Sequence, residues 1–152
     1  MRLYLDSSAL AKRYIDEPGA ARVRACLASA GELFLSVLTL PEVAAALNRL
    51  RREGRLSDAA YESCKGRLLA DLADASVVSL TPGLLSVAVR CLESAPLRAA
   101  DAVHVACALE VAPDRFVSAD RRQCEAARAM GLRVEEIAGE EDAVGCADGP
   151  SR

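Results

Sequence analysis

Four acidic residues lie at positions from which carboxylate oxygens could meet. They are Asp6, Glu42, Asp101 and Asp120. Asp6 directly follows the apolar run Leu3–Leu5, and Asp120 follows the run Phe116–Ser118. Glu42 comes after a further apolar run and a turn, whereas Asp101 opens an apolar helical stretch. Carboxylates are the hard ligands that Mg²⁺ and Mn²⁺ prefer, so together these residues could form a site for a divalent ion.

Each acid also has a purely structural explanation. Asp6 precedes a helical pattern and could cap it. Asp101 lies in the first turn of its helix, where the helix dipole favours an anion. Two pairs have the spacing of a capping box: Thr39 with Glu42, and Asp120 with Gln123. For any single acid, the sequence leaves capping and metal binding equally open.

The elements that would position these acids alternate along the chain. The predicted strands are Arg2–Leu5, Leu33–Ser36, Ser76–Leu80, Arg115–Ser118 and Arg133–Glu136. The predicted helices are Ala9–Ile15, Ala20–Ser29, Pro41–Glu53, Asp58–Ala73, Gly83–Ser94, Arg98–Val111 and Arg121–Met130. Short apolar strands separated by helices indicate parallel βαβ units. The predicted fold is a three-layer α/β/α domain over residues 1–137, with a central parallel sheet of about five strands.

This architecture would bring the four acids together. Every strand-to-helix turn of a parallel sheet lies at the carboxyl edge of the strands, where such folds bind ligands. The helix that holds Asp101 precedes the strand Arg115–Ser118 and runs antiparallel to it, so its first turn lies at that edge as well. Carboxylates packed closely without a cation raise one another's pKa. We therefore expect a divalent ion among them.

Two of the predicted helices form a hairpin, because only Gly54–Ser57 separates them. Its tip carries Arg49, Arg51, Arg52 and Arg55. These arginines are candidates for contacts to the phosphates of a nucleic acid, and a solvated tip is the alternative. Arg121 and Arg122 follow Asp120 directly and are further candidates.

Composition permits a nucleic-acid partner without requiring one. The chain has 152 residues and a net charge of −3, all of which is accounted for by the acidic segment 138–152. This segment lacks periodicity, and we expect it to be disordered. No apolar run is long enough to span a membrane, and the N-terminus does not resemble a secretion signal, so a cytoplasmic protein is expected. The six cysteines show no CxxC spacing and are expected to be reduced, mostly buried thiols.

Four ordered motifs resemble those of the PIN-domain ribonucleases. They are Leu5–Lys12, Leu38–Val43, Leu97–His104 and Phe116–Asp120, and within the family they are most similar to the VapC-like toxins of type II toxin–antitoxin pairs. The resemblance spans Met1 to about Ile137. It implies a Mg²⁺- or Mn²⁺-dependent endoribonuclease that cuts RNA, a small antitoxin that blocks the site, and a homodimer. Ala100 and Val103 depart from the residues common in the family, with no expected consequence.

By this match Asp6, Glu42, Asp101 and Asp120 form the acidic site. Asp6 and Asp101 would hold the principal ion, and the other two would act directly or through water. Four further residues are candidates for support: Ser7, Ser118, Arg98 and His104. Ser7 would bond a phosphate or a metal-bound water, or only cap its helix, and Ser118 would steady Asp120. His104 is expected to be a hydrogen-bonded neighbour of the site more than a general acid, and Arg98 to pair with Asp101 or to contact phosphate.

Two other functions stay open at this level. A phosphate-handling, Mg²⁺-binding domain of the receiver or phosphatase type would also place acids at the carboxyl edge. It would need a lysine late in the chain, however, and the only lysines are Lys12 and Lys65. A non-catalytic PIN-like interaction module would need none of the acids, and all four are present.

Overall fold

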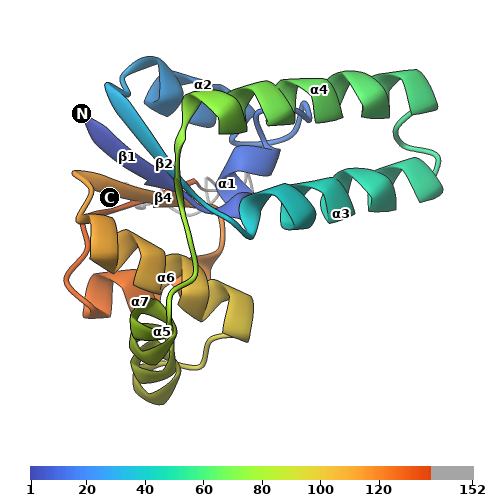
Figure 1. The fold of residues 1–152 in the computed structure, drawn as a ribbon. Coiled ribbons are helices and arrows are strands. Elements are labelled where there is room, and N and C mark those ends of the chain that lie inside the picture. Colours follow the sequence, from blue (N-terminus) through green and yellow to red (C-terminus); the bar gives the residue numbers. More distant parts are fainter. Residues whose placement is uncertain (138–152) are drawn as a thin grey trace, which may run out of the picture.

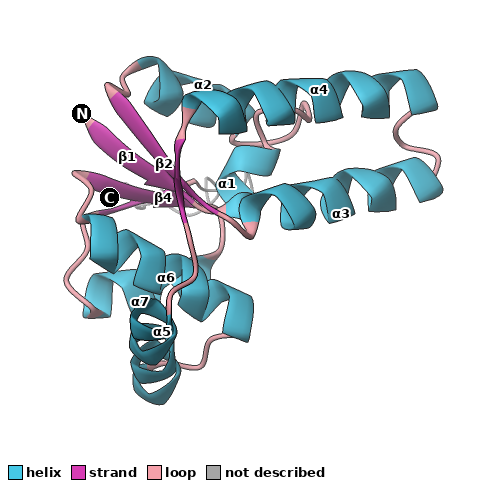
Figure 2. Ribbon diagram, viewed as in Figure 1, coloured by secondary structure: helices cyan, strands magenta, loops and turns pink. Residues whose placement is uncertain are grey.

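A computed structural model describes residues 1–137 of the chain and shows one five-stranded sheet. The strands are β1 (Arg2–Leu5), β2 (Glu32–Ser36), β3 (Ser76–Val78), β4 (Arg115–Ser118) and β5 (Val134–Glu136). Their spatial order is β3-β2-β1-β4-β5, and every neighbouring pair is parallel. The predicted parallel sheet is therefore confirmed, and β1 lies at its centre (Figure 2).

Seven helices cover the two faces of the sheet in the described part of the chain. They are α1 (Ser7–Ala11), α2 (Ala20–Ala28), α3 (Thr39–Arg52), α4 (Asp58–Asp74), α5 (Pro82–Ser94), α6 (Ala99–Val111) and α7 (Arg121–Ala129). Helices α1 to α4 lie on one side of the sheet and α5 to α7 on the other (Figure 1). The three-layer α/β/α prediction is confirmed.

The period-two geometry of β1 divides the core between these layers. Leu3 and Leu5 are buried among side chains from α1 to α4. Tyr4, between them in sequence, is buried on the opposite face with Phe116 and with side chains of α5, α6 and α7. The central strand therefore anchors both halves of the core, and it ends directly before Asp6.

The predicted helical hairpin is formed by α3 and α4, which extend beyond the sheet as a long antiparallel pair (Figure 1). Gly54 lies in the connecting turn with φ of 72°, a conformation that glycine adopts without strain. Asn48 Nδ2 donates to Tyr61 Oη across the pair at 2.8 Å, and the Arg51 guanidinium lies over the Tyr61 ring, 4.7 Å from its centroid. These contacts fix the hairpin close to its tip.

Three predicted elements have boundaries that are wrong by two to four residues. Helix α1 ends at Ala11 rather than Ile15, because the chain turns there and Tyr14 packs into the core. Helix α3 begins at Thr39, so Thr39 is not its cap: the cap is Leu38, and it makes no side-chain cap bond. The predicted Thr39–Glu42 capping box is therefore wrong. Strand β3 ends at Val78, two residues before the predicted Leu80.

The cysteine prediction is confirmed for the described residues. The five cysteines there are free and buried: Cys26, Cys64, Cys91, Cys107 and Cys124. Burial raises the pKa of Cys107, and it raises that of Cys124 to about 12, so these thiols stay protonated near neutral pH. Cys146 and the acidic segment 138–152 lie outside the described residues. Within residues 1–137, no helix has the length and apolar character needed to cross a membrane.

Candidate active site

A pocket of about 430 Å³ opens at the carboxyl edge of the sheet, and all four predicted acids line it. Its walls come from α1 and the loop after it, one face of α3 with Arg55 in the turn beyond it, the start of α6, and the β4–α7 turn with the first turn of α7. Asp6 follows β1, Asp120 follows β4, and Asp101 lies in the first turn of α6. The prediction that these residues meet at one edge is therefore correct in its geometry.

Asp6 lies at the base of the pocket and is only 2% exposed. It caps α1, since its Oδ1 accepts from the Ala9 N–H at 2.8 Å. Its other bonds come from hydroxyls: Ser8 Oγ donates at 2.7 Å and Ser118 Oγ at 2.8 Å, both to Oδ2. Burial raises the pKa of Asp6, and these donors and the nearby His104 offset only part of that rise. A buried carboxylate with only neutral hydrogen-bond donors is poorly stabilised without a cation.

Glu42 is held from two sides. Ser7 Oγ donates to Glu42 Oε2 at 2.5 Å, and His104 Nε2 lies 2.7 Å from the same oxygen. Burial acts to raise the pKa of Glu42, but the hydrogen bonds from His104 and Ser7 outweigh it, and the net pKa is lowered. Glu42 is thus kept ionised and oriented by two of the predicted supporting residues.

Asp101 and Asp120 are linked through Gln123. Gln123 Nε2 donates to Asp101 Oδ1 at 3.1 Å, and the Gln123 backbone N–H donates to Asp120 Oδ1 at 3.1 Å. The predicted Asp120 cap is confirmed, but the Gln123 side chain does not return to the cap residue as a capping box requires. Ser118 Oγ accepts from the Asp120 N–H at 3.0 Å, so Ser118 bonds the backbone of Asp120 and the carboxylate of Asp6.

The basic candidates divide into two groups. Arg49 and Arg55 line the pocket, as does Lys12, whose ammonium pairs with Glu17 at 3.2 Å. Four others do not line it: Arg51, Arg52, Arg121 and Arg122. Arg51 pairs with Asp58 at 3.7 Å, and Arg121 pairs with Glu125 at 3.0 Å along α7.

The expected pairing of Arg98 with Asp101 is absent. Arg98 is exposed at the N-cap of α6 and makes no side-chain bond in the described residues.

The chemistry of the ligands fits a divalent cation, although the present arrangement is not a closed metal site. Asp6, Asp101 and Asp120 receive hydrogen bonds only from neutral groups within residues 1–137. Their charge is thus uncompensated by lysine or arginine. Among the same residues, no three His, Cys, Asp or Glu side chains are grouped so that they could hold a metal ion. Burial, and not a neighbouring carboxylate as expected from the sequence, raises the pKa of Asp6.

Four residues in or beside the site were not predicted: Ser8, Lys12 and Gln123, which line the pocket, and Tyr4, whose Oη lies 2.9 Å from His104 Nδ1. Ser8 was detectable, because a serine two residues after a capping aspartate can bond its carboxylate. Gln123 was noted only as a capping partner. Lys12 reaches the pocket because α1 ends early, and Tyr4 is hidden in an apolar strand pattern, so neither gave a sequence signal.

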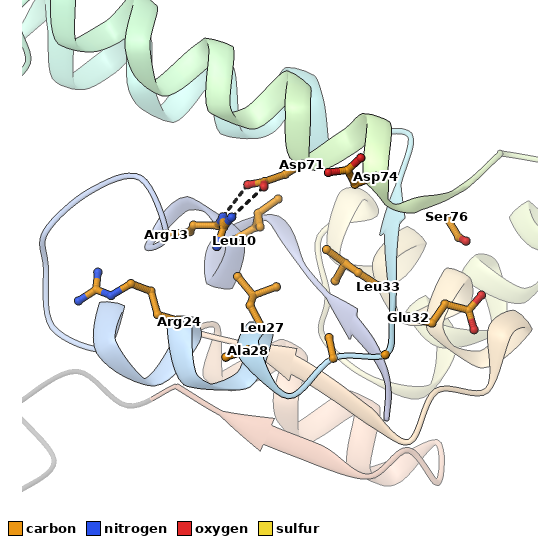
Figure 3. Close-up of a pocket in the computed structure, with 12 residues that line it drawn as sticks. Leu10, Arg13, Arg24, Leu27, Ala28, Glu32, Leu33, Asp71, Asp74 and Ser76 are labelled. Carbon is orange, nitrogen blue, oxygen red and sulfur yellow. Dashed lines mark hydrogen bonds and ion pairs between the residues drawn. The ribbon is translucent and has the colours of Figure 1, made fainter.

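A second hollow, of about 470 Å³, lies at the opposite edge of the sheet, where β2 and β3 begin and α2 and α4 end (Figure 3). It contains two aspartates, Asp71 and Asp74, and an apolar floor that includes Leu10, Leu27 and Leu33. Arg13 binds Asp71 through Nε at 2.6 Å and through a second nitrogen at 2.9 Å. The charge of Asp71 is thus already neutralised, which distinguishes this hollow from the carboxyl-edge pocket.

Comparisons with known proteins agree with this geometry. The sequence model of the PIN domain matches residues 3–129, and none of the curated proteins matches the sequence. Three solved structures with the same fold illustrate the likeness.

The first is VapC20 of Mycobacterium tuberculosis, a toxin described as cleaving the sarcin–ricin loop, with 18% identity and a TM-score of 0.65 over 86% of this chain and 95% of that one. PAE2754 of Pyrobaculum aerophilum has 22% identity and a TM-score of 0.66, covering 88% and 90%. VapBC2 of Rickettsia felis, bound to a fragment of its promoter DNA, has 12% identity and a TM-score of 0.65, covering 90% and 98%. At these identities the likeness shows the fold alone.

Proposed function

The chain belongs to the PIN domain family, and on that premise we propose that it is a Mg²⁺- or Mn²⁺-dependent endoribonuclease that acts as the toxin of a type II toxin–antitoxin pair. One observation carries the proposal. Four carboxylates line a single pocket, and three of them have no basic partner within residues 1–137. Such a pocket suits the binding of a divalent ion beside a phosphodiester.

Asp6 and Asp101 are the proposed protein ligands of the ion, and Glu42 and Asp120 bind it directly or through water. A bound ion lowers the pKa of a water molecule and offsets the charge that develops at the scissile phosphate. The protein's own contribution is orientation. Ser8 and Ser118 fix Asp6, Gln123 fixes Asp101, and Ser7 and His104 fix Glu42.

Lys12, Arg49 and Arg55 would contact the phosphates on either side of the cut, since all three line the pocket. Ser7 Oγ already donates its hydrogen to Glu42, so its proposed role is to hold Glu42 rather than to bond a phosphate. With five aromatic residues in the chain, stacking on RNA bases is a minor source of recognition, and shape and hydrogen bonding are expected to dominate.

The proposed partner is a small antitoxin that blocks this pocket. Support comes from structural neighbours described as toxin–antitoxin complexes, among them one from Klebsiella pneumoniae and the DNA-bound VapBC of Salmonella typhimurium. A cytoplasmic location follows from the same proposal.

We also propose a homodimer that is formed through α5. Leu85, Val89 and Leu92 are exposed at spacings that place them on one face of this helix. Arg90 and Glu93 are exposed beside them, and a second copy related by a two-fold axis could pair these opposite charges. Val89→Glu should convert the dimer to a monomer in sedimentation experiments, and an unchanged mass would exclude this face.

The nuclease proposal is tested by RNA cleavage with and without Mg²⁺ or Mn²⁺, in the parent protein and in Asp6→Asn and Asp101→Asn. We expect cleavage that requires the ion and is lost in both variants, while both stay folded by circular dichroism. Cleavage in the presence of EDTA, or full activity in both variants, would refute the mechanism. A folded parent that cuts no RNA would instead favour the non-catalytic interaction module.

A further inference from the structure

A hydrogen-bonded chain runs from the buried centre of the sheet to the wall of the pocket. Tyr4 on β1 is fully buried, and its Oη lies 2.9 Å from His104 Nδ1. His104 on α6 is 1% exposed, and its Nε2 lies 2.7 Å from Glu42 Oε2. The two nitrogens of one imidazole therefore join a core tyrosine to a pocket carboxylate.

The hydrogens in this chain can be assigned from their partners. Ser7 has one hydroxyl hydrogen, and at 2.5 Å it is donated to Glu42 Oε2. Toward His104 Nε2, which lies 3.1 Å away, the Ser7 oxygen can therefore act only as a hydrogen-bond acceptor. An ionised carboxylate only accepts a hydrogen, and the Tyr4 phenol, which carries one hydrogen, lies against the other imidazole nitrogen, Nδ1. The hydrogen between His104 and Glu42 must then belong to Nε2, and Tyr4 donates to Nδ1.

Tyr4 is held so that its hydroxyl has little freedom. Its ring stacks on Phe116 at a centroid distance of 5.6 Å and an interplanar angle of 14°. It meets the His104 ring edge-on, at 6.1 Å and 74°. The strand that presents Tyr4 on this face ends at Asp6, so one short element positions both a pocket carboxylate and the support of another.

We propose that Tyr4 is a positioning residue of the active site. Its hydroxyl selects the imidazole tautomer of His104 that carries hydrogen on Nε2, and this tautomer holds Glu42 against the pocket wall. The consequence for RNA cleavage rests on the proposed function. The tautomer does not, because it depends only on contacts within the protein.

The chain has one histidine, so nuclear magnetic resonance gives an unambiguous test. Long-range ¹H–¹⁵N correlation spectra of ¹⁵N-histidine-labelled protein report which imidazole nitrogen carries the hydrogen. We expect hydrogen on Nε2 in the parent and a mixture of tautomers in Tyr4→Phe. A parent imidazole with hydrogen only on Nδ1 overturns the proposal, and this result needs no variant.

Tyr14→Phe is the matched control, because it removes a buried tyrosine hydroxyl outside the pocket, bonded to Asp71 at 2.6 Å. It should leave both the histidine spectrum and cleavage by the folded protein unchanged. Tyr4→Phe should lower kcat about fivefold with little change in KM, the effect of one lost hydrogen bond. An unchanged tautomer in a folded Tyr4→Phe overturns the proposal. If the parent cuts no RNA, the nuclease proposal fails, and the spectra still decide this one.

Discussion

The two hollows of this domain lie at opposite edges of one parallel sheet, and the aspartates in them have different hydrogen-bond partners. At the amino edge, where α2 and α4 end, Asp71 is bound by the guanidinium of Arg13 and by the Tyr14 hydroxyl. At the carboxyl edge, where helices begin, Asp6 and Asp120 instead cap α1 and α7. Helix N-termini supply neutral N–H donors and a favourable dipole, so acids can gather there without arginine.

Neither the volume of a hollow nor the presence of carboxylates in it identifies the active site. The hollows have similar volumes, about 470 and 430 Å³, and both contain carboxylates. They differ in what balances the charge. The Arg13–Asp71 pair is already neutral and stabilises the fold, whereas the carboxyl-edge acids keep a charge that a cation or a substrate must balance. The following experiments separate these roles.

The largest expected difference is in catalysis. Glu42→Gln removes a charge from the carboxyl-edge pocket and should lower kcat for RNA cleavage about a hundredfold, because the ion and its water lose a ligand or an orienting group. Asp71→Asn changes a carboxylate in the other hollow and should leave kcat of the folded protein unchanged. Comparable losses in both variants would contradict the assignment.

Stability should show the reverse order. Arg13→Met leaves the half-buried Asp71 without its bidentate partner and should cost about 2 kcal/mol in the free energy of unfolding by urea. Lys12→Met, at the adjacent residue, removes an ion pair with Glu17 and a hydrogen bond to the Pro18 carbonyl oxygen but no bidentate contact, and it should cost about 1 kcal/mol. If the two losses are equal, Arg13–Asp71 is not the stabilising pair.

Salt dependence should separate the basic residues. Arg49 lines the carboxyl-edge pocket, so Arg49→Ala should weaken RNA binding a few-fold and reduce the slope of log affinity against log salt by about one unit. Arg24 is also exposed but lines the other hollow, so Arg24→Ala is the control and should leave the slope unchanged. If only Arg24→Ala weakened RNA binding, the RNA would bind at the amino edge of the sheet, and the proposed site would be contradicted.

The smallest effect concerns Asp6. Its raised pKa means that the folded state binds more protons than the unfolded state, so its contribution to stability falls as pH rises through the unfolded value, about 3.9. Asp6→Asn has no carboxylate to ionise, so the variant does not lose stability in this way as the pH rises. In EDTA, the stability of the variant relative to the parent should therefore increase between pH 4 and pH 7 in urea titrations. A relative stability that decreases over this range would contradict the burial of a charged Asp6.

The sequence predicted the fold well because apolar strands and turn positions are local signals. It also placed the four acids at one edge, since parallel βαβ connectivity leaves no other place for Asp6 and Asp120. The errors have tertiary causes. Thr39 fails as a cap because α3 begins at Thr39 itself, with Leu38 as the cap residue, and the Thr39 Oγ1 is left buried without a partner.

Side-chain partners were the hardest to predict. Arg98 precedes Asp101 by three residues, a spacing that allows contact across the start of a helix, yet the two side chains do not pair. Gln123 bonds Asp101, and Tyr4 bonds His104. The two partners in each of these contacts lie far apart in the sequence. No periodicity encodes such pairs. The role of each acid in binding an ion stays a prediction.

Titration with Mn²⁺, followed by the electron paramagnetic resonance of the free ion, tests the central claim most directly. The parent should bind Mn²⁺, Asp6→Asn and Asp101→Asn should each weaken binding at least about tenfold, and Asp71→Asn should bind as the parent does. Parent-like binding in both carboxyl-edge variants, or its loss in Asp71→Asn, would contradict the claim that the carboxyl edge holds the ion.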